Sequence, residues 1–152
     1  MKLDDCINLD DLRKVAKQRV PKLIYDFIEG GSEDESGLVR NEDAFRNRAL
    51  VPRYMVDISS INQDTELFGR TYSSAYGIAP TGGISNYRHK GDLMLARAAR
   101  DANIPFIMSG AATARMEDMA REAPDHGWYQ LYTAKDRAIA DDQVLSLIHI
   151  SE

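Results

Sequence analysis

The chain has 152 residues and carries 24 acidic against 19 basic side chains, which gives a formal net charge of −5. This acidic balance, without a cluster of lysine and arginine, argues against a nucleic-acid surface, because phosphate binding needs a concentrated basic footprint. A single cysteine, Cys6, excludes an intrachain disulfide and a thiolate metal cluster, so a reducing cytoplasm is the default location. Neither a signal peptide nor a run of 18 apolar residues is found, and no membrane span is expected.

The first part of the chain is predicted to be helical. Asn8 can cap a helix whose apolar residues share one face, and Pro21 should interrupt or restart that helix. Helical spacing continues over residues 23–28, and the glycine pair at 30–31 is a typical C-terminal stop. The sequence therefore predicts two short helices separated by a proline.

Another helix start and a hairpin follow. Residues 32–35, Ser-Glu-Asp-Glu, have the form of a capping box and predict a helix that begins at Ser32 and directs Leu38 and Phe45 toward a core. The alternating segment 65–72 predicts a small hairpin that turns around Gly69.

After the hairpin, strand-like and helical segments alternate. Short apolar runs at 76–79, 104–108 and 128–132 predict strands, and the segments 92–102 and 113–123 predict helices between them. The strand starts recur every 24 to 28 residues, which is typical of βα units around a parallel sheet. The fold class is therefore α/β, with a helical lead-in and about three βα units.

Small and neutral polar residues occur at or just after the end of each predicted strand, at 79–83, 109–113 and 130–133. Parallel α/β folds bind ligands outside the carboxyl ends of their strands. Small residues let a flat ligand approach the backbone closely, while hydroxyl and amide groups offer uncharged hydrogen-bond partners. These segments suit a planar ligand with polar edges.

Purely structural roles remain open for the same residues. Gly82 can serve only a turn, and Ser109 and Thr113 can be helix caps without any further role. Gln130 and Tyr132 lie two apart on a strand and point to the same side, where a core or surface role is as plausible as a ligand role.

Other candidate residues receive a structural interpretation. Tyr25 lies among apolar helix neighbours and is, by itself, interpreted as packing. His89 and His126 have no partners at metal-ligand spacing, so both are expected at the surface or in turns, and no metal is expected. The segment 77–83 does not fit a dinucleotide-binding fingerprint, because Pro80 occupies the middle of the turn.

Four sequence blocks carry a family resemblance. They are YDFIEGGSEDE at 25–35, APTG at 79–82, GD at 91–92 before an alanine-rich helix, and WYQLY at 128–132. In order and spacing they resemble the FMN-dependent α-hydroxy-acid dehydrogenase and oxidase family, over residues from about 9 to about 144. Within that family the chain looks most similar to the (S)-mandelate and L-lactate dehydrogenase branch.

The resemblance implies a (β/α)8 TIM barrel that binds FMN at the carboxyl ends of its strands and oxidises an L-2-hydroxy acid to the 2-oxo acid. It implies that the backbone at Pro80, Thr81 and Gly82 lies against the flavin ring, and that Ser109 and Gln130 hydrogen-bond the cofactor. Gly82 stands where dehydrogenase-like members tend to have glycine and oxidase-like members alanine.

The resemblance also implies partners. Tyr25 and Tyr132 would direct their hydroxyls at the substrate, with Tyr25 facing its carboxylate. The substrate is a small 2-hydroxy acid and the electron acceptor a quinone, a cytochrome or oxygen, with no nucleic acid involved. A homo-oligomer is left open for the full-length protein, and so is a place at the inner face of the membrane rather than free in the cytoplasm.

The barrel is expected to be incomplete, because a TIM barrel takes about 250 residues. The catalytic histidine base of the family is expected beyond Glu152, so no catalytic residue is assigned within the chain. Residues 1–144 are predicted to be the N-terminal part of the enzyme domain. Residues 145–152 depart from the family pattern and are predicted to be a non-native or read-through tail. The alternatives are an inactive truncated fragment and an unrelated barrel such as an aldolase or isomerase.

Overall fold

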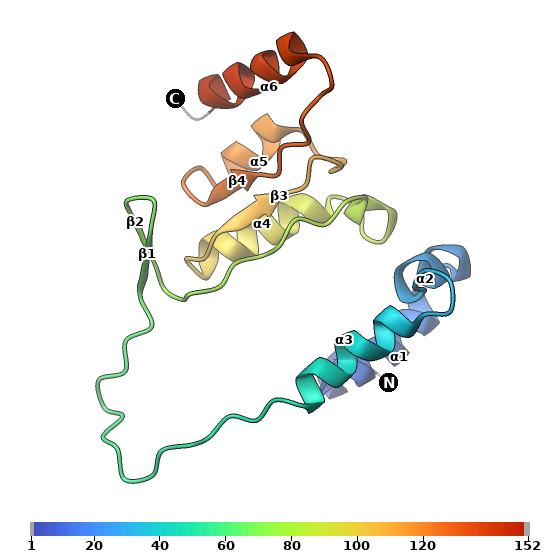
Figure 1. The fold of residues 1–152 in the computed structure, drawn as a ribbon, viewed down its shortest axis with the longest axis vertical. Helices are drawn as coiled ribbons and strands as arrows, with labels where there is room; N and C mark the ends of the chain where they lie inside the picture. Colours follow the sequence, from blue (N-terminus) through green and yellow to red (C-terminus); the bar gives the residue numbers. More distant parts are fainter. Residues whose placement is uncertain (1, 151–152) are drawn as a thin grey trace. The chain divides into compact units, whose positions relative to one another are not determined.

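The computed structural model describes the chain from residue 2 to residue 150, with side chains described up to residue 147 (Figure 1). It divides into two compact units, Met1–Ser60 and Ile61–Glu152. The first unit is helical, and the second contains both the hairpin and the βα segments. Each unit is described by itself.

The first unit confirms the predicted pair of helices around Pro21. The side chain of Asn8 accepts a hydrogen bond from the Asp11 backbone N–H at 2.9 Å and caps the first helix as expected. Pro21 stands at the N-cap of the second helix, and Gly30 ends it. The elements of the unit are a short 3-10 helix η1 (Leu3–Asp5) and the helices α1 (Leu9–Arg19), α2 (Lys22–Glu29) and α3 (Ser36–Arg46).

The predicted capping box at Ser32 is wrong. Helix α3 begins at Ser36, and Glu35 before it has a left-handed backbone with φ of 60°. The Glu35 carboxylate accepts a hydrogen bond from the Gly31 backbone N–H at 3.2 Å instead of reaching back to Ser32. A Cβ atom built on the Gly31 backbone with ideal geometry would lie 2.9 Å from Cγ of Leu38, which is too close for a side chain. A tight turn that needs glycine at this position therefore replaces the expected cap.

The expectation that Leu38 and Phe45 face a core is also wrong. Phe45 is 83% exposed and Leu38 is exposed as well. Among residues 2–60, only Val15 is buried. The helices of this unit therefore cover almost none of their apolar surface with one another, and sequence periodicity by itself does not reveal that.

The second unit begins with the predicted hairpin, which is confirmed. Strands β1 (Thr65–Leu67) and β2 (Arg70–Tyr72) pair antiparallel, with Leu67 opposite Arg70. Both turn residues have positive φ, 51° at Phe68 and 78° at Gly69, which glycine tolerates and phenylalanine rarely adopts. The Phe68 ring packs edge-on against Trp128 with centroids 5.3 Å apart, a contact that helps to hold this turn.

The parallel βα arrangement is confirmed for the next segments. Strands β3 (Phe106–Met108) and β4 (Gly127–Tyr129) pair in parallel, with Phe106 opposite Gly127. The connecting helix α5 (Met116–Glu122) is shorter than predicted, and α4 (Gly91–Asp101) precedes β3. The remaining elements are η2 (Ile84–Asn86), a 3-10 turn, and the helix α6 (Arg137–Ile150).

The strand predicted at 76–79 is reduced to a single bridge between Ile78 and Phe106. The backbone N–H of Ile78 donates to the Pro105 carbonyl at 2.8 Å, and its carbonyl accepts from the Ile107 N–H at 3.0 Å. Pro80 has no N–H with which to form the next hydrogen bond of the parallel ladder, so the pairing with β3 ends after Ile78. The position predicted for the strand is right, and its length is wrong.

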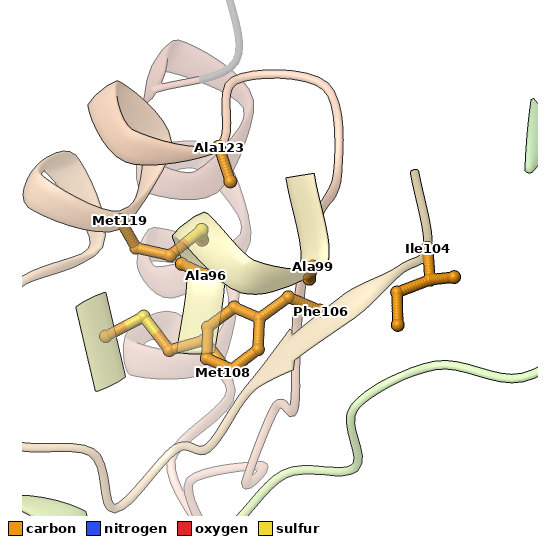
Figure 2. Packing of buried hydrophobic residues seen from close by; sticks show 7 residues of the cluster. All are labelled: Ala96, Ala99, Ile104, Phe106, Met108, Met119 and Ala123. Atoms are coloured by element: carbon orange, nitrogen blue, oxygen red, sulfur yellow. The ribbon is translucent and has the colours of Figure 1, made fainter. Parts of the chain in front are cut away.

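The core of the second unit lies between α4, α5 and β3 (Figure 2). Two alanines of α4 are fully buried and let the helix approach the strand closely. The buried cluster comprises Ala96, Ala99, Ile104, Phe106, Met108, Met119 and Ala123. This packing fixes α4 and α5 beside β3, and so fixes where the loops at the strand ends begin.

The parallel sheet is a partial barrel: within the described residues it consists of β3, β4 and the bridge at Ile78. Helix α6 runs through residue 144 without interruption, so secondary structure does not mark the predicted boundary of a tail there. Residues 151 and 152 of that segment lie outside the described residues. Among the residues that the structure describes, no helix has the length and apolar character needed to cross a bilayer.

Candidate functional site

Two loops that follow parallel segments meet at the carboxyl ends of the strands. The backbone N–H of Gly83, which follows the Ile78 bridge, donates to the carbonyl of Ala111, which follows β3, at 3.2 Å. An ideal Cβ on Gly82 would lie 3.2 Å from Cβ of Ala111 and 3.7 Å from Oγ of Ser109. Gly82 and Ser109, predicted from separate segments, therefore lie together.

A hydrogen bond joins the loop after β3 to the end of β4. The buried Ser109 hydroxyl donates to Oε1 of Gln130 at 3.1 Å and accepts from the Ala111 backbone N–H at 3.1 Å. The Gln130 backbone N–H donates to the carbonyl of Met108 at 2.8 Å, so a hydrogen bond to β3 holds this residue in place. The Gln130 amide nitrogen has no partner within the described residues, and it can donate to a ligand.

Tyr132 lies directly on the same loop. An ideal Cβ at Gly110 would stand 2.5 Å from Cδ2 of Tyr132 and 2.8 Å from the Gln130 carbonyl oxygen, so the backbone at Gly110 and the tyrosine ring are in close contact. The tyrosine is 62% exposed, which leaves its hydroxyl accessible to a ligand. Gly110 was not among the predicted site residues, and its position between Ser109 and Ala111 was the only signal for it in the sequence.

Pro80 and Thr81 occupy the backbone between the Ile78 bridge and Gly82. Pro80 is half-buried and Thr81 is exposed. The hydrogen bond of Ile78 on one side and that of Gly83 on the other fix both ends of this short segment. The structure thus brings together all the predicted site residues of the second unit.

Tyr25 belongs to the first unit, where it is half-buried on α2. Burial and, after it, the neighbouring Glu29 carboxylate raise the pKa of the Tyr25 phenol above its ordinary value. A tyrosine hydroxyl is protonated at neutral pH in any case and can donate a hydrogen bond. Glu29 is itself held by Nε of Arg13 at 2.9 Å, and Arg13 also contacts Glu42 of α3 at 3.2 Å. This ion-pair group fixes the surroundings of the tyrosine.

The interpretation of Thr113 as a cap of the following helix is wrong. Helix α5 begins at Met116, and Arg115 stands at its N-cap without a capping hydrogen bond. The Thr113 hydroxyl instead lies 3.0 Å from Oδ2 of Asp92, a carboxylate that is only 1% exposed. Asp92 was not singled out as a site residue, because an acid in the first turn of a helix ordinarily needs only the helix dipole to explain it.

His126 lies in the predicted turn before β4, but it is buried rather than at the surface, whereas His89 is exposed as expected. His126 is 7% exposed, and its Nε2 lies 3.0 Å from Nη2 of Arg70 and 3.2 Å from Oδ1 of Asn103. Arginine can only donate a hydrogen bond and the Asn103 amide oxygen can only accept one, so Nε2 lies between a donor and an acceptor. Within the described residues, the buried Nδ1 has no hydrogen-bond partner. The contact with Arg70 ties the β1–β2 hairpin to the start of β4, away from the loops at the carboxyl ends.

Acid should weaken the full-length protein through His126. Burial, and next the positive charge of Arg70, hold the pKa of His126 below its ordinary value; Arg100 adds to this effect and Asp125 opposes it. Above about pH 6.5 the ring is neutral in both states. Below that pH the unfolded chain takes up the proton first, so the free energy of unfolding falls.

The measurement is the melting temperature at pH 7.5 and pH 5.5. We expect His126→Gln to reduce the loss of melting temperature on acidification, and His89→Gln, at an exposed ring, to leave that loss unchanged. An equal loss in wild type and His126→Gln would contradict this account.

The assembled groups fit a planar cofactor with polar edges. Gly82 presents backbone without a side chain, and a hydroxyl and an amide lie close to it at Ser109 and Gln130. In the part of the chain that the structure describes, no group of three or more histidine, cysteine, aspartate or glutamate side chains could hold a metal ion. Uncharged donors of this kind suit a flavin, which takes hydrogen bonds along its edge.

Comparison with known proteins agrees with this geometry. (S)-Mandelate dehydrogenase of Pseudomonas putida is 42% identical over 142 residues, which are 93% of this chain and 36% of the relative. A 2-hydroxyacid oxidase of Dictyostelium discoideum is 35% identical over 144 residues, 94% of this chain and 37% of the relative. The structure of a soluble mutant of the membrane-associated (S)-mandelate dehydrogenase from Pseudomonas putida matches with a TM-score of 0.87 and 41% identity, over 96% of this chain and 42% of that one.

The chain thus spans less than half the length of these relatives. A family model described as FMN-dependent dehydrogenase matches residues 16–147. Together with the flavin-compatible groups at the carboxyl ends of the parallel strands, this match shows that the chain belongs to the FMN-dependent dehydrogenase family.

Proposed function

We propose that this chain supplies part of the flavin site and two substrate contacts of an enzyme that oxidises an L-2-hydroxy acid, of lactate or mandelate type, to the 2-oxo acid. The observation that carries the proposal is the convergence of Gly82, the Ser109–Gln130 hydrogen bond and Tyr132 on one edge of the sheet. FMN, when bound, accepts the two electrons that leave the α-carbon of the substrate.

The residues of the second unit hold the cofactor in this proposal. The backbone at Pro80, Thr81 and Gly82 presents a surface without bulky side chains to the ring. Ser109 fixes Gln130 by donating to Oε1, so the amide nitrogen of Gln130 would be the group that donates to the cofactor. Preorganised neutral donors favour negative charge on the reduced ring without a reorganisation cost during the reaction.

The substrate contacts are the two tyrosines. Tyr132 contacts the backbone of Gly110 and is 62% exposed, and Tyr25, like any tyrosine at neutral pH, carries the proton of its hydroxyl. A protonated phenol can donate to a substrate carboxylate, and such a charge-assisted bond is roughly twice as strong as a neutral one.

The partners and location are proposed on the same basis. The electron acceptor is a quinone, a cytochrome or oxygen, and the protein acts in the cytoplasm or at the inner face of the membrane. Support comes from the relatives, one of which is a dehydrogenase described as membrane-associated and another an oxidase.

The test is to express the full-length protein and to measure bound FMN and the oxidation of (S)-mandelate and L-lactate, with oxygen and with an artificial acceptor in parallel. We expect stoichiometric FMN and turnover of at least one of the two acids. A purified, folded protein without FMN would refute the proposal. A protein that binds FMN but does not oxidise 2-hydroxy acids would refute the proposed substrate class.

Gly82→Ala in the full-length protein should change the reaction of the reduced flavin with oxygen. The new methyl group would lie 3.2 Å from Cβ of Ala111, so the loop has to shift by a few tenths of an ångström beside the ring. Because oxidase-like members resemble the alanine variant here, we expect several-fold faster reoxidation, measured by stopped flow in air-saturated buffer. Gly37→Ala, where an added methyl group meets nothing within 4 Å, is the control. Equal rates in wild type and Gly82→Ala would remove Gly82 from the flavin contact.

A further inference from the structure

Asp92 is a buried acid that the proposed chemistry does not use. It lies in the first turn of α4 and is 1% exposed. A buried carboxylate is costly unless it is hydrogen-bonded, and the first turn of a helix is a favourable place for a negative charge. The Thr113 hydroxyl, 3.0 Å from Oδ2, is the side-chain partner that this carboxylate finds in the loop after β3.

The same threonine hydroxyl also bonds the hydroxyl of Ser85. A hydroxyl has one hydrogen to donate, and an ionised carboxylate can only accept. Thr113 therefore donates to Asp92 and accepts from Ser85. The three side chains form a directed relay, in which the charge on Asp92 determines the orientation of both hydroxyls.

The relay ends at the loop that is proposed to face the flavin. Ser85 lies in η2, immediately after Gly82 and Gly83. Gly83 has a left-handed backbone with φ of 66°, and its N–H donates to the Ala111 carbonyl. The loop is thus attached to the loop after β3 at two places, by a backbone bond at Gly83 and by the relay at Ser85.

A close contact between η2 and α4 supports the same arrangement. An ideal Cβ on Gly91 would lie only 2.3 Å from Cγ2 of Ile84, so η2 packs directly on the first turn of α4 that carries Asp92. This contact, like the relay, joins the loop that contains Gly82 and Gly83 to the start of α4.

We infer that Asp92, acting through Thr113 and Ser85, is a positioning residue that holds the backbone of Pro80, Thr81 and Gly82 in the conformation that receives FMN. The identity of the ligand, FMN, rests on the proposed function, whereas the relay rests on the hydrogen bonds alone. Without the relay, the backbone of residues 80–82 is less constrained. FMN binding then has to order this segment, which lowers the affinity for FMN.

The test compares variants of the full-length protein. Thr113→Val removes both hydrogen bonds at nearly constant size, Thr113→Ser restores the hydroxyl, and Ser85→Ala detaches only the end of the relay. Asp92→Asn removes the charge, and Asp101→Asn, at an exposed acid near the other end of α4, is its matched control. The readouts are amide exchange at Gly83, the FMN dissociation constant, the visible spectrum of bound FMN and the melting temperature.

We expect Thr113→Val to accelerate exchange at Gly83 and to raise the FMN dissociation constant, each roughly 10-fold, since bonds to charged groups have effects of this order. Its FMN spectrum should shift as well. Thr113→Ser should recover the wild-type values. Ser85→Ala leaves the hydrogen bond between Thr113 and the buried Asp92 intact, and it should reproduce the effects with little change in melting temperature.

Two results would overturn the inference. One is an amide-exchange rate at Gly83 that is the same in Ser85→Ala and Asp92→Asn as in the wild-type protein. This measurement needs no bound cofactor. The other is a lower melting temperature in Thr113→Val with wild-type FMN affinity and spectrum, which would make the relay merely structural. Absence of FMN from the wild-type protein would refute the proposed function, while the exchange measurement would still decide whether the relay holds the loop.

Discussion

A polypeptide of only these 152 residues is expected to show no cooperative unfolding transition and no oxidation of mandelate or lactate. The large apolar side chains of the first unit that are at least 77% exposed include Leu9, Leu23, Phe27, Phe45 and Leu50. Covering each would contribute about 2 kcal/mol, together about 10 kcal/mol, which is the whole net stability of an ordinary domain. In the second unit, β4 pairs with β3 along one edge and has no described partner on the other.

The measurement is a thermal scan by far-ultraviolet circular dichroism, with binding of a dye that reports exposed apolar surface and an assay of both acids. The full-length protein is the control and should melt cooperatively without binding the dye. A sharp transition together with turnover in the 152-residue polypeptide would show that these elements are sufficient by themselves.

Tyr25→Phe in the full-length protein is expected to lower kcat/KM by roughly 10- to 150-fold, because it deletes a hydrogen bond to a charged substrate group. The ring itself remains, so buried area is nearly unchanged and melting temperature and bound FMN should stay at wild-type values. A residue that only packs on α2 would give no effect in any of the three measurements. The two interpretations therefore make opposite predictions for kcat/KM.

Tyr54→Phe is the matched control, since Tyr54 lies in the same unit and is exposed. It should leave kcat/KM unchanged. Wild-type kcat/KM in Tyr25→Phe would return this tyrosine to a packing role and leave Tyr132 as the one substrate contact proposed within the chain.

Local sequence signals determined much of the secondary structure. The cap at Asn8, the break at Pro21 and the turn at Gly69 all occur where the sequence predicts them, because each depends on the chemistry of one or two neighbouring residues. The parallel pairing of β3 with β4 was also predictable, since the recurrence of strands and helices depends on spacing along the chain.

The candidate site was predictable only as separate segments. The sequence placed Ser109 and Gln130 after successive strands, and the register of β3 against β4 decided that their side chains meet at 3.1 Å. Gly110 was missed because its need for a bare backbone comes from Tyr132, which lies 22 positions further along the chain.

Only the tertiary structure decided which polar residues are buried. Asp92 and His126 resemble an ordinary helix acid and an ordinary turn histidine in the sequence, yet both are buried, because Thr113 and Arg70 reach them from distant segments. Burial and hydrogen bonds between distant segments depend on the tertiary structure, so local sequence patterns do not predict them. The capping box predicted at Ser32 does not form, because Glu35 accepts from the Gly31 backbone N–H and α3 begins only at Ser36.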